Sequence, residues 1–276
     1  MIEYLVLISF IGFVAFLVPG RHRKYAAIIG WTCIVLALFA TLPEYFRENN
    51  FIYPLMAALS LPFLVITAKY LLREDERVIN LSRAAAVAFV IYAPFDYELH
   101  HILALAPLGD GLIAVVVGQV VWILAFLNFP VTLDAWNIIM HNAFRVEIIL
   151  GCTGIQSIAI MLGVAAAVPT TLRQKVLAFL IIAPTIYFLN LLRNVFVIMA
   201  YTEQWFPYYP EIASNGEFGY ESFFWAHNVI AELTALVLLV IIAYGLFTII
   251  PRLGTFADEL YQLYSGEVMR AFGKGK

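Results

Sequence analysis

The sequence predicts an all-α, polytopic membrane protein: a transmembrane helical bundle of about eight spans with a small external cap segment before Cys152. Of its 276 residues, 63% are hydrophobic and 13% are charged, and the mean hydropathy is +0.89. Soluble domains are nearer half apolar and a quarter charged. The apolar residues form unbroken runs that can cross a hydrocarbon core of about 30 Å, whereas a membrane β-barrel would show short alternating segments.

The apolar runs can be followed along the chain from the N-terminus. They cover roughly residues 2–18, 25–42, 52–72, 84–95, 111–127, 153–168, 175–200 and 223–249. No basic segment precedes the first run and no small-residue cleavage site follows it, so we expect a retained span and not a signal peptide. The run 84–95 ends at Pro94. We expect a broken or re-entrant continuation through Asp96–His101 into Ile102–Leu108.

Residues 128–151 are too polar to span a membrane. They contain Asn128, Asp134, Asn137, His141, Asn142, Arg145 and Glu147. The short runs Val131–Leu133, Ile138–Met140 and Val146–Leu150 are partly β-branched, with the turn-forming residues Asp134 and Asn142 between them. We expect a small external cap, such as a hairpin, that leads directly to Cys152.

No repeat or linker divides the chain, so one membrane domain of residues 1–276 is the simplest organisation. Its expected parts are a helical scaffold, an external segment, the active-site helices and a cytoplasmic tail, over residues 1–127, 128–151, 152–250 and 251–276. The tail begins with Pro251 and carries mixed charge, which predicts a short amphipathic helix. Cys33 lies within an apolar run and is expected to be a small buried hydrophobic residue.

Basic residues in short loops favour the cytoplasmic side of a membrane. Arg173 and Lys175 lie between two runs, and further basic residues follow the last run, whereas residues 201–222 hold four Glu and neither Lys nor Arg. We therefore expect 201–222 to be external, with Cys152, Arg193 and His227 near the external surface on three successive helices.

The N-terminal half conflicts with this count. The basic segments 21–24 and 69–83 both favour the cytoplasm, which would place the N-terminus outside and residues 128–151 inside. We expect eight spans and a cytoplasmic N-terminus, because three loops agree in the C-terminal half.

Cys152 is the first candidate catalytic residue. A thiol is a nucleophile when deprotonated, and a nearby cation or helix N-terminus favours the thiolate. Cys152 precedes a predicted helix, and Gly151 and Gly154 allow close backbone approach. Gln156, four residues later, is expected on the same helical face as an oxyanion or peptide-carbonyl donor. Taken alone, the stretch is explained equally well as a helix-packing motif of small residues.

Arg193 is the second candidate, because a cation inside a span is costly unless it pairs, snorkels to the surface or faces a cavity. Asn190 and Asn194 make a polar patch around it, and together with Asn228 they are candidates to bind the substrate or its oxyanion. A guanidinium beside Cys152 would favour the thiolate and clamp an oxyanion or a substrate carboxylate.

His227 is the third candidate, since histidine is the usual base for a nucleophilic thiol and then the acid for its leaving group. Asn228 follows it, and Glu232 lies one turn deeper, where it would orient a polar group, pair with Arg193 or face a water-filled cavity. The alternative for His227 alone is an interfacial histidine bonded to a loop.

Other kinds of site have little support. His100 and His101, with Asp96 and Glu98, have the residue types of a metal site without a defensible spacing, so we expect no metal and no cofactor. A net charge of −3 with no basic block beyond Arg21–Lys24 gives nucleic-acid binding no support.

The stretches Gly151-Cys-Thr-Gly-Ile-Gln-Ser157, Leu192-Arg-Asn194 and Ala226-His-Asn228 together resemble the exosortase/archaeosortase family, and the first is closest to its archaeosortase branch. The resemblance is specific over residues 146–232. It implies a thiol protease or transpeptidase that faces outward in the cell membrane. Cys152 would be the nucleophile, Arg193 the family's arginine and His227 its variable third residue.

The resemblance also implies the partners. They are secreted surface proteins with a C-terminal sorting tail, made of a Pro-Gly-Phe-type motif, a transmembrane helix and a basic end, and a membrane lipid that accepts the new C-terminus. Two alternatives stay open. One is a transporter with Arg193 and Glu232 as pathway charges, for which no inverted repeat is found. The other is a non-catalytic assembly or chaperone protein.

Overall fold

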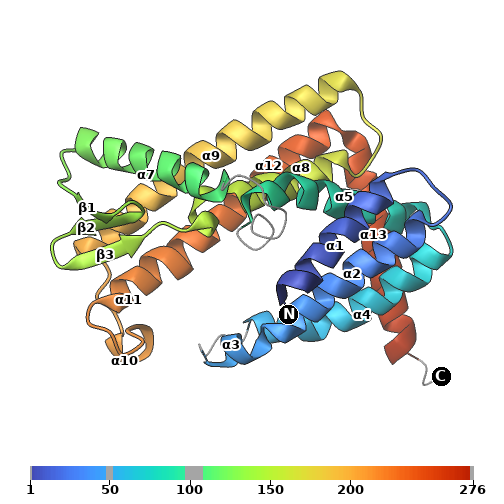
Figure 1. Cartoon of the computed structure of the whole chain (residues 1–276), viewed down its shortest axis with the longest axis horizontal. Helices are drawn as coiled ribbons and strands as arrows, with labels where there is room; N and C mark the ends of the chain where they lie inside the picture. Colours follow the sequence, from blue (N-terminus) through green and yellow to red (C-terminus); the bar gives the residue numbers. More distant parts are fainter. Residues whose placement is uncertain (1, 48–51, 97–107, 274–276) are drawn as a thin grey trace. The chain divides into compact units, whose positions relative to one another are not determined.

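The computed structural model describes residues 2–47, 52–96 and 108–273. The helices confirm the all-α membrane fold (Figure 1). They are α1 (Ile2–Leu17), α2 (Arg23–Ala40), α3 (Leu42–Arg47), α4 (Ile52–Leu72), α5 (Glu76–Tyr92), η1 (Ala93–Phe95), α7 (Leu108–Phe126), η2 (Leu150–Thr153), α8 (Ile155–Ala166), α9 (Leu172–Thr202), α10 (Pro210–Ala213), α11 (Tyr220–Phe223), η3 (Phe224–Ala231), α12 (Glu232–Ile249) and α13 (Pro251–Phe272).

The predicted apolar runs all contain helix in the described parts of the chain, yet the number of spans is not confirmed. Within those parts, six helices are long and apolar enough to cross a membrane, while α1 and α8 are shorter. The continuation of the run 84–95 falls largely on residues 97–107, outside the described residues.

Helix α5 begins earlier than the sequence indicated, at Glu76 and not at residue 84. The reason is its N-cap: the Asp75 side chain accepts a hydrogen bond from the Arg77 amide at 3.0 Å. Arg83 then donates to the Ala167 carbonyl at 3.1 Å. Much of the basic segment 69–83 is therefore helix and not loop.

The chain forms two compact units, one of residues 1–105, 159–178 and 246–276, and the other of residues 106–158 and 179–245. Single-domain organisation stays a prediction. In the first unit, α1 and α2 approach closely, because a Cβ at Gly12 would lie 2.9 Å from the Gly30 nitrogen. The Phe13 ring packs against Trp31 at 5.3 Å. Cys33 is buried, as the sequence predicted.

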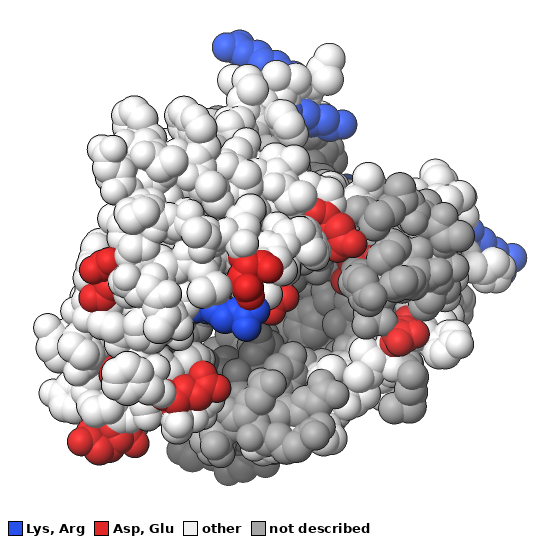
Figure 2. Space-filling model, turned by 60° about the vertical axis from the view of Figure 1, so that its left-hand side comes forward, with Lys and Arg blue, Asp and Glu red and all other residues white. Residues whose placement is uncertain are grey.

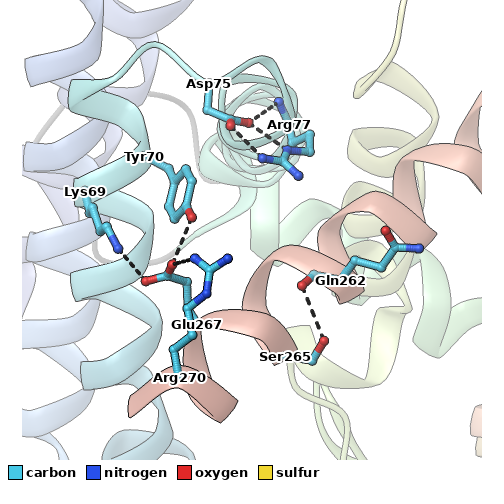
Figure 3. Close-up of polar contacts among 8 residues, drawn as sticks. All are labelled: Lys69, Tyr70, Asp75, Arg77, Gln262, Ser265, Glu267 and Arg270. Carbon is cyan, nitrogen blue, oxygen red and sulfur yellow. Dashed lines mark hydrogen bonds and ion pairs between the residues drawn. The ribbon is translucent and has the colours of Figure 1, made fainter. Parts of the chain in front are cut away.

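The C-terminal segment forms the predicted amphipathic helix, α13, within the first unit (Figure 3). The Glu267 carboxylate accepts hydrogen bonds from Lys69, from the Tyr70 hydroxyl at 3.0 Å and from Arg270 at 3.0 Å. The hydrogen bond from Lys69 is the largest cause that lowers the pKa of Glu267. One turn away, the Tyr264 ring stacks on Phe63 at 5.4 Å. These contacts join α13 to α4.

The second unit contains the predicted cap as a three-stranded antiparallel sheet, β1 (Thr132–Ala135), β2 (Ile138–His141) and β3 (Phe144–Glu147), in the order β1-β2-β3. Ile139 pairs with Leu133 and Val146. Its buried side chain joins a core shared with α7 and α9, whose members include Val120, Leu124, Ile148, Leu191 and Ile198.

One turn of this cap differs from the prediction. Asn142 forms the expected turn, at φ 53°. Asp134 does not form a turn: it lies in β1, where the register is irregular, and pairs with Arg145 of β3. The first turn lies at residues 136–137. Asn137 fits there because its buried amide donates to the Ile148 carbonyl at 3.2 Å, at the end of the sheet that leads to Cys152.

Candidate active site

Cys152 precedes the helix α8, as the sequence predicted, and it lies in a separate 3-10 helix, η2, which Gly154 divides from α8. Its amide donates to the Ile149 carbonyl at 2.8 Å, so this N–H is already paired. Gly154 ends η2 at φ 79°, in the left-handed region. A Cβ at that position would lie 3.2 Å from the Asn190 side chain. The sharp turn therefore depends on glycine.

The predicted face shared by Cys152 and Gln156 does not exist. An i, i+4 relation holds only along a continuous α-helix, and the left-handed Gly154 interrupts the chain between the two residues. Gln156 is exposed on the first turn of α8. Its role as an oxyanion donor therefore loses the geometric basis that the sequence suggested.

Two amides from α9 hold the Cys152 turn. Asn190 and Asn194 both donate to the Cys152 carbonyl oxygen, at 2.5 and 2.7 Å. They lie four residues apart, on one face of α9, and Asn194 is buried. The structure thus uses these side chains to position Cys152. The substrate-binding role predicted for them stays a prediction.

Arg193 and His227 are in contact. Arg193 Nη2 lies 3.1 Å from His227 Nε2, and His227 Nδ1 lies 2.7 Å from Asn228 Oδ1. Arginine can only donate, so His227 Nε2 accepts, and Nδ1–H donates to Asn228. This pattern is that of a neutral imidazole protonated on Nδ1. Asn228, predicted to bind substrate, here orients the imidazole.

A π-helix carries His227. The segment η3 (Phe224–Ala231) is π-helical between α11 and α12, a local widening that often occurs at functional sites. The Phe223 ring stacks on the His227 imidazole, with centroids 4.8 Å apart and planes 16° apart. Sequence reasoning missed Phe223, although its i, i+4 spacing to His227 was a usable signal.

The structure brings two of the three predicted residues together and anchors the third beside them. Asn190, Arg193 and Asn194 form one stretch of α9 that binds both the Cys152 carbonyl and His227. The thiol itself is half-buried against the core that α7 shares with the sheet. Among the described residues it is hydrogen-bonded to neither Arg193 nor His227.

Glu232 does not pair with Arg193 in the described part of the chain; it is exposed at the start of α12. The transporter alternative therefore gains no support from this pair. No group of three or more His, Cys, Asp or Glu within the described residues could hold a metal. Glu98, His100 and His101 of the rival metal site lie outside those residues.

A cavity of about 390 Å³ opens beside the Arg193 side chain. Gly154 and Ser157, which follow Cys152, line it together with side chains of α9, η3 and α12. Apart from Ser157, Asn190, Arg193 and Thr234, its lining is apolar or glycine. Ser157 is a further site residue that sequence reasoning missed, because no polarity rule separates it from an ordinary helical serine.

Figure 2 shows carboxylate side chains spread over the face turned forward, with few basic side chains among them. In the described residues, the sheet and the 201–222 segment carry the exposed carboxylates Asp134, Glu147, Glu203, Glu211 and Glu217 and the half-buried Glu221. Glu203, which follows α9, bonds to His141 Nε2 at 2.7 Å and so ties the sheet to that helix.

Comparison with known proteins gives a consistent result. The model of the transmembrane exosortase family matches residues 3–208, a range that contains Cys152 and Arg193 and ends before His227. Archaeosortase A of Haloferax volcanii is 26% identical over 269 residues, which cover 90% of this chain and 88% of that protein. Archaeosortase A of Natronomonas pharaonis is 26% identical over 265 residues, covering 86% and 79%. No solved structure matches.

Proposed function

The chain belongs to the transmembrane exosortase family, and on that premise we propose that this multi-pass membrane processing enzyme is a thiol transpeptidase. Its substrates are secreted surface proteins that end in a sorting tail, a short motif of the Pro-Gly-Phe type followed by a transmembrane helix. It removes the tail at the external face of the membrane and joins the new C-terminus to a membrane lipid.

The first step is acylation of Cys152. His227 Nε2 takes the proton of the Cys152 thiol, the thiolate attacks the scissile carbonyl carbon, the C–S bond forms and the C–N bond breaks, and His227 passes the same proton to the leaving amine. An amine or hydroxyl of a lipid headgroup then attacks the thioester, the C–S bond breaks, and the thiol is regenerated. Neither step needs a metal or a redox cofactor to balance.

The contact between Arg193 and His227, on the stretch of α9 that also holds Cys152, is the observation that carries the proposal. In the free protein the Arg193 guanidinium donates a hydrogen bond to His227 Nε2, the nitrogen that would accept the thiol proton. A substrate carbonyl that draws the guanidinium toward its oxygen would free Nε2 and stabilise the oxyanion at once. Catalytic hydrogen bonds often form only when substrate binds, which is consistent with a thiol that, within the described residues, is bonded to neither Arg193 nor His227.

The first prediction concerns Cys152. In cells that co-express a surface protein with a sorting tail, Cys152→Ala should abolish tail removal, because alanine cannot form the thioester. The size of the mature protein on a gel measures it. Cys33→Ala, which removes the buried thiol of α2, is the matched control and should process normally. Normal tail removal by Cys152→Ala would falsify the proposal.

The chemistry of the intermediate has a separate readout. Mass spectrometry of the wild-type protein after brief exposure to substrate should find the acyl group on the peptide that contains Cys152. The peptide that contains Cys33 should be unmodified. An acyl group on any other residue would contradict the assigned nucleophile.

A further inference from the structure

The cavity beside Arg193 is an elongated slot within the second unit. Its lining on α9 runs from Ile186 to Phe196, and its lining on η3 and α12 runs from Ile230 to Ile242. At 1.5 Å per residue, the α9 side is about 15 Å long. That length equals about half of a hydrocarbon core of ~30 Å, the thickness of one leaflet.

Polarity divides the slot along its length. Helix α9 and the η3–α12 segment are joined by residues 203–219 and run in opposite directions (Figure 1). The polar lining residues are Ser157, Asn190, Arg193 and Thr234, whereas Ile186, Leu238, Leu239 and Ile242 form an aliphatic part. The polar half adjoins Gly154 and Ser157, directly after the nucleophile.

The size of the slot excludes an entire transmembrane helix as its occupant. A helix about 10 Å wide and 30 Å long fills roughly 2,400 Å³, whereas the cavity measures about 390 Å³. A mainly apolar cavity of about 390 Å³ whose α9 side is about one leaflet long has room for a single extended hydrocarbon chain.

The positive charge of Arg193 at the polar end of the slot determines which headgroup an apolar ligand should carry. Arg193 is a half-buried cation whose contact is the neutral His227 ring, and within the described residues no carboxylate forms an ion pair with it. A cation in this position favours an anion that fits its planar fork, and phosphate does so. Carboxylate also fits the fork, but a Pro-Gly-Phe-type motif contains no anionic side chain, so the tail offers Arg193 no such group at the cleavage site.

We propose that the slot binds one hydrocarbon chain of a phosphate-bearing membrane lipid, with the phosphate at Arg193 and the headgroup nucleophile directed at Cys152. This inference rests on the proposed function, since it makes the lipid the acceptor. When the phosphate draws Arg193 away, His227 Nε2 is free to take the proton of the attacking amine or hydroxyl. The new C–N or C–O bond forms as the C–S bond breaks, and the sulfur leaves as thiolate.

The binding test uses the purified full chain in lipid nanodiscs and a phosphatidic acid probe with a diazirine in its acyl chain. After illumination, mass spectrometry should find the label on residues that line the slot. Leu239→Trp, which fills the slot, should reduce that labelling roughly tenfold, the equivalent of about two buried methylene groups. Leu236→Trp is the matched control on the same helix, because Leu236 is 59% exposed and does not line the slot.

Uncharged diacylglycerol with the same diazirine chain tests the role of the phosphate and should label the slot more weakly than the anionic probe. Labelling spread evenly over the exposed side of α12, equal labelling by both probes, or no effect of Leu239→Trp would overturn the proposal. If Leu239→Trp fails to fold, Ala235→Phe fills the same slot from the next turn.

A second readout separates the lipid from the substrate tail. In the co-expression assay, Leu239→Trp should raise the fraction of Cys152 trapped as the thioester, because tail release still acylates the thiol while the lipid that resolves the thioester no longer binds. If the fraction of acylated Cys152 falls together with lipid attachment, the slot seats the peptide tail and the inference is wrong. The photolabelling is repeated on Cys152→Ala, because binding of the lipid probe does not require the thiol. Slot labelling of the wild type without any tail removal would contradict the proposed chemistry alone, and loss of slot labelling would contradict this inference alone.

Discussion

At the scale of single residues, the site depends on a turn that only glycine fits. Gly154 adopts φ 79° and lies against Asn190, the residue that holds the Cys152 carbonyl. Any side chain here would strain the backbone and press on Asn190. Gly154, which has no side chain to take part in the reaction, therefore helps to set the position of the nucleophile Cys152.

Gly154→Ala should therefore destabilise the protein by about 1–2 kcal/mol, the cost of a left-handed non-glycine residue, and should slow tail removal. Thermal unfolding and the co-expression assay measure the two effects. Gly151→Ala is the matched control, because a Cβ there meets nothing within 4 Å and Gly151 has no positive φ. Equal effects of the two substitutions would show that the turn is not required.

Arg193 is predicted to act through its fork of donors and not through its charge alone. Arg193→Lys keeps the charge but replaces the planar fork of N–H donors, which can hold an oxyanion with two hydrogen bonds, by a single ammonium group, so tail removal should slow by about 10²–10³-fold, as for loss of an oxyanion donor. Arg145→Lys, at an exposed ion pair on β3, provides a matched control with little effect. Full activity of Arg193→Lys would rule out the bidentate role.

At the scale of elements, helix α13 is attached to α4 by one carboxylate with three donors. Glu267 accepts from Lys69, Tyr70 and Arg270 (Figure 3). The hydrogen bond from Lys69, the largest cause, lowers the pKa of Glu267 below the usual glutamate range. A carboxylate with a lowered pKa stabilises the folded state in its ionised form.

The stabilisation from Glu267 should be fully present above the ordinary glutamate pKa of about 4.3 and should be lost as the pH falls through the lower folded value. Glu267→Gln should accordingly lower the unfolding temperature at neutral pH, and its difference from wild type should shrink in acid. Glu259→Gln, at an exposed position of α13, should show a much smaller difference. A Glu267→Gln effect independent of pH would contradict the role of the ionised carboxylate.

At the scale of the whole molecule, the distribution of charge predicts an orientation. The 201–222 segment has four Glu and no Lys or Arg, while α13 and its end carry Arg252, Arg270, Lys274 and Lys276. From the positive-inside tendency we expect the former outside and the latter in the cytoplasm, which would put the active site at the external face.

Thiol labelling of intact cells tests this orientation in a chain with Cys33→Ala and Cys152→Ala. A membrane-impermeant maleimide should label Phe218→Cys, at a side chain that is 94% exposed, without permeabilisation. It should label Asp258→Cys, exposed on α13, only after the membrane is opened. Labelling of both from outside, or the reverse order, would overturn the predicted topology.

The sequence by itself determined the membrane class, the course of most helices, the small sheet before Cys152 and the identity of the family. These follow from hydropathy, residue spacing and short motifs, which are local properties of the chain. It also singled out Arg193 and His227, because a polar group in an apolar run is conspicuous wherever the fold places it. The missed start of α5 reflects a cap whose polar first turn hides the helix from a hydropathy reading.

Only the tertiary structure decided how these residues work together. The Asn190 and Asn194 amides reach Cys152 across 38 and 42 residues of chain, and Arg193 reaches His227 across 34. The slot likewise exists only where α9, η3 and α12 meet. Such contacts depend on the path of the backbone through Gly154 and the π-helix, which the spacing of residues along an idealised helix cannot foresee.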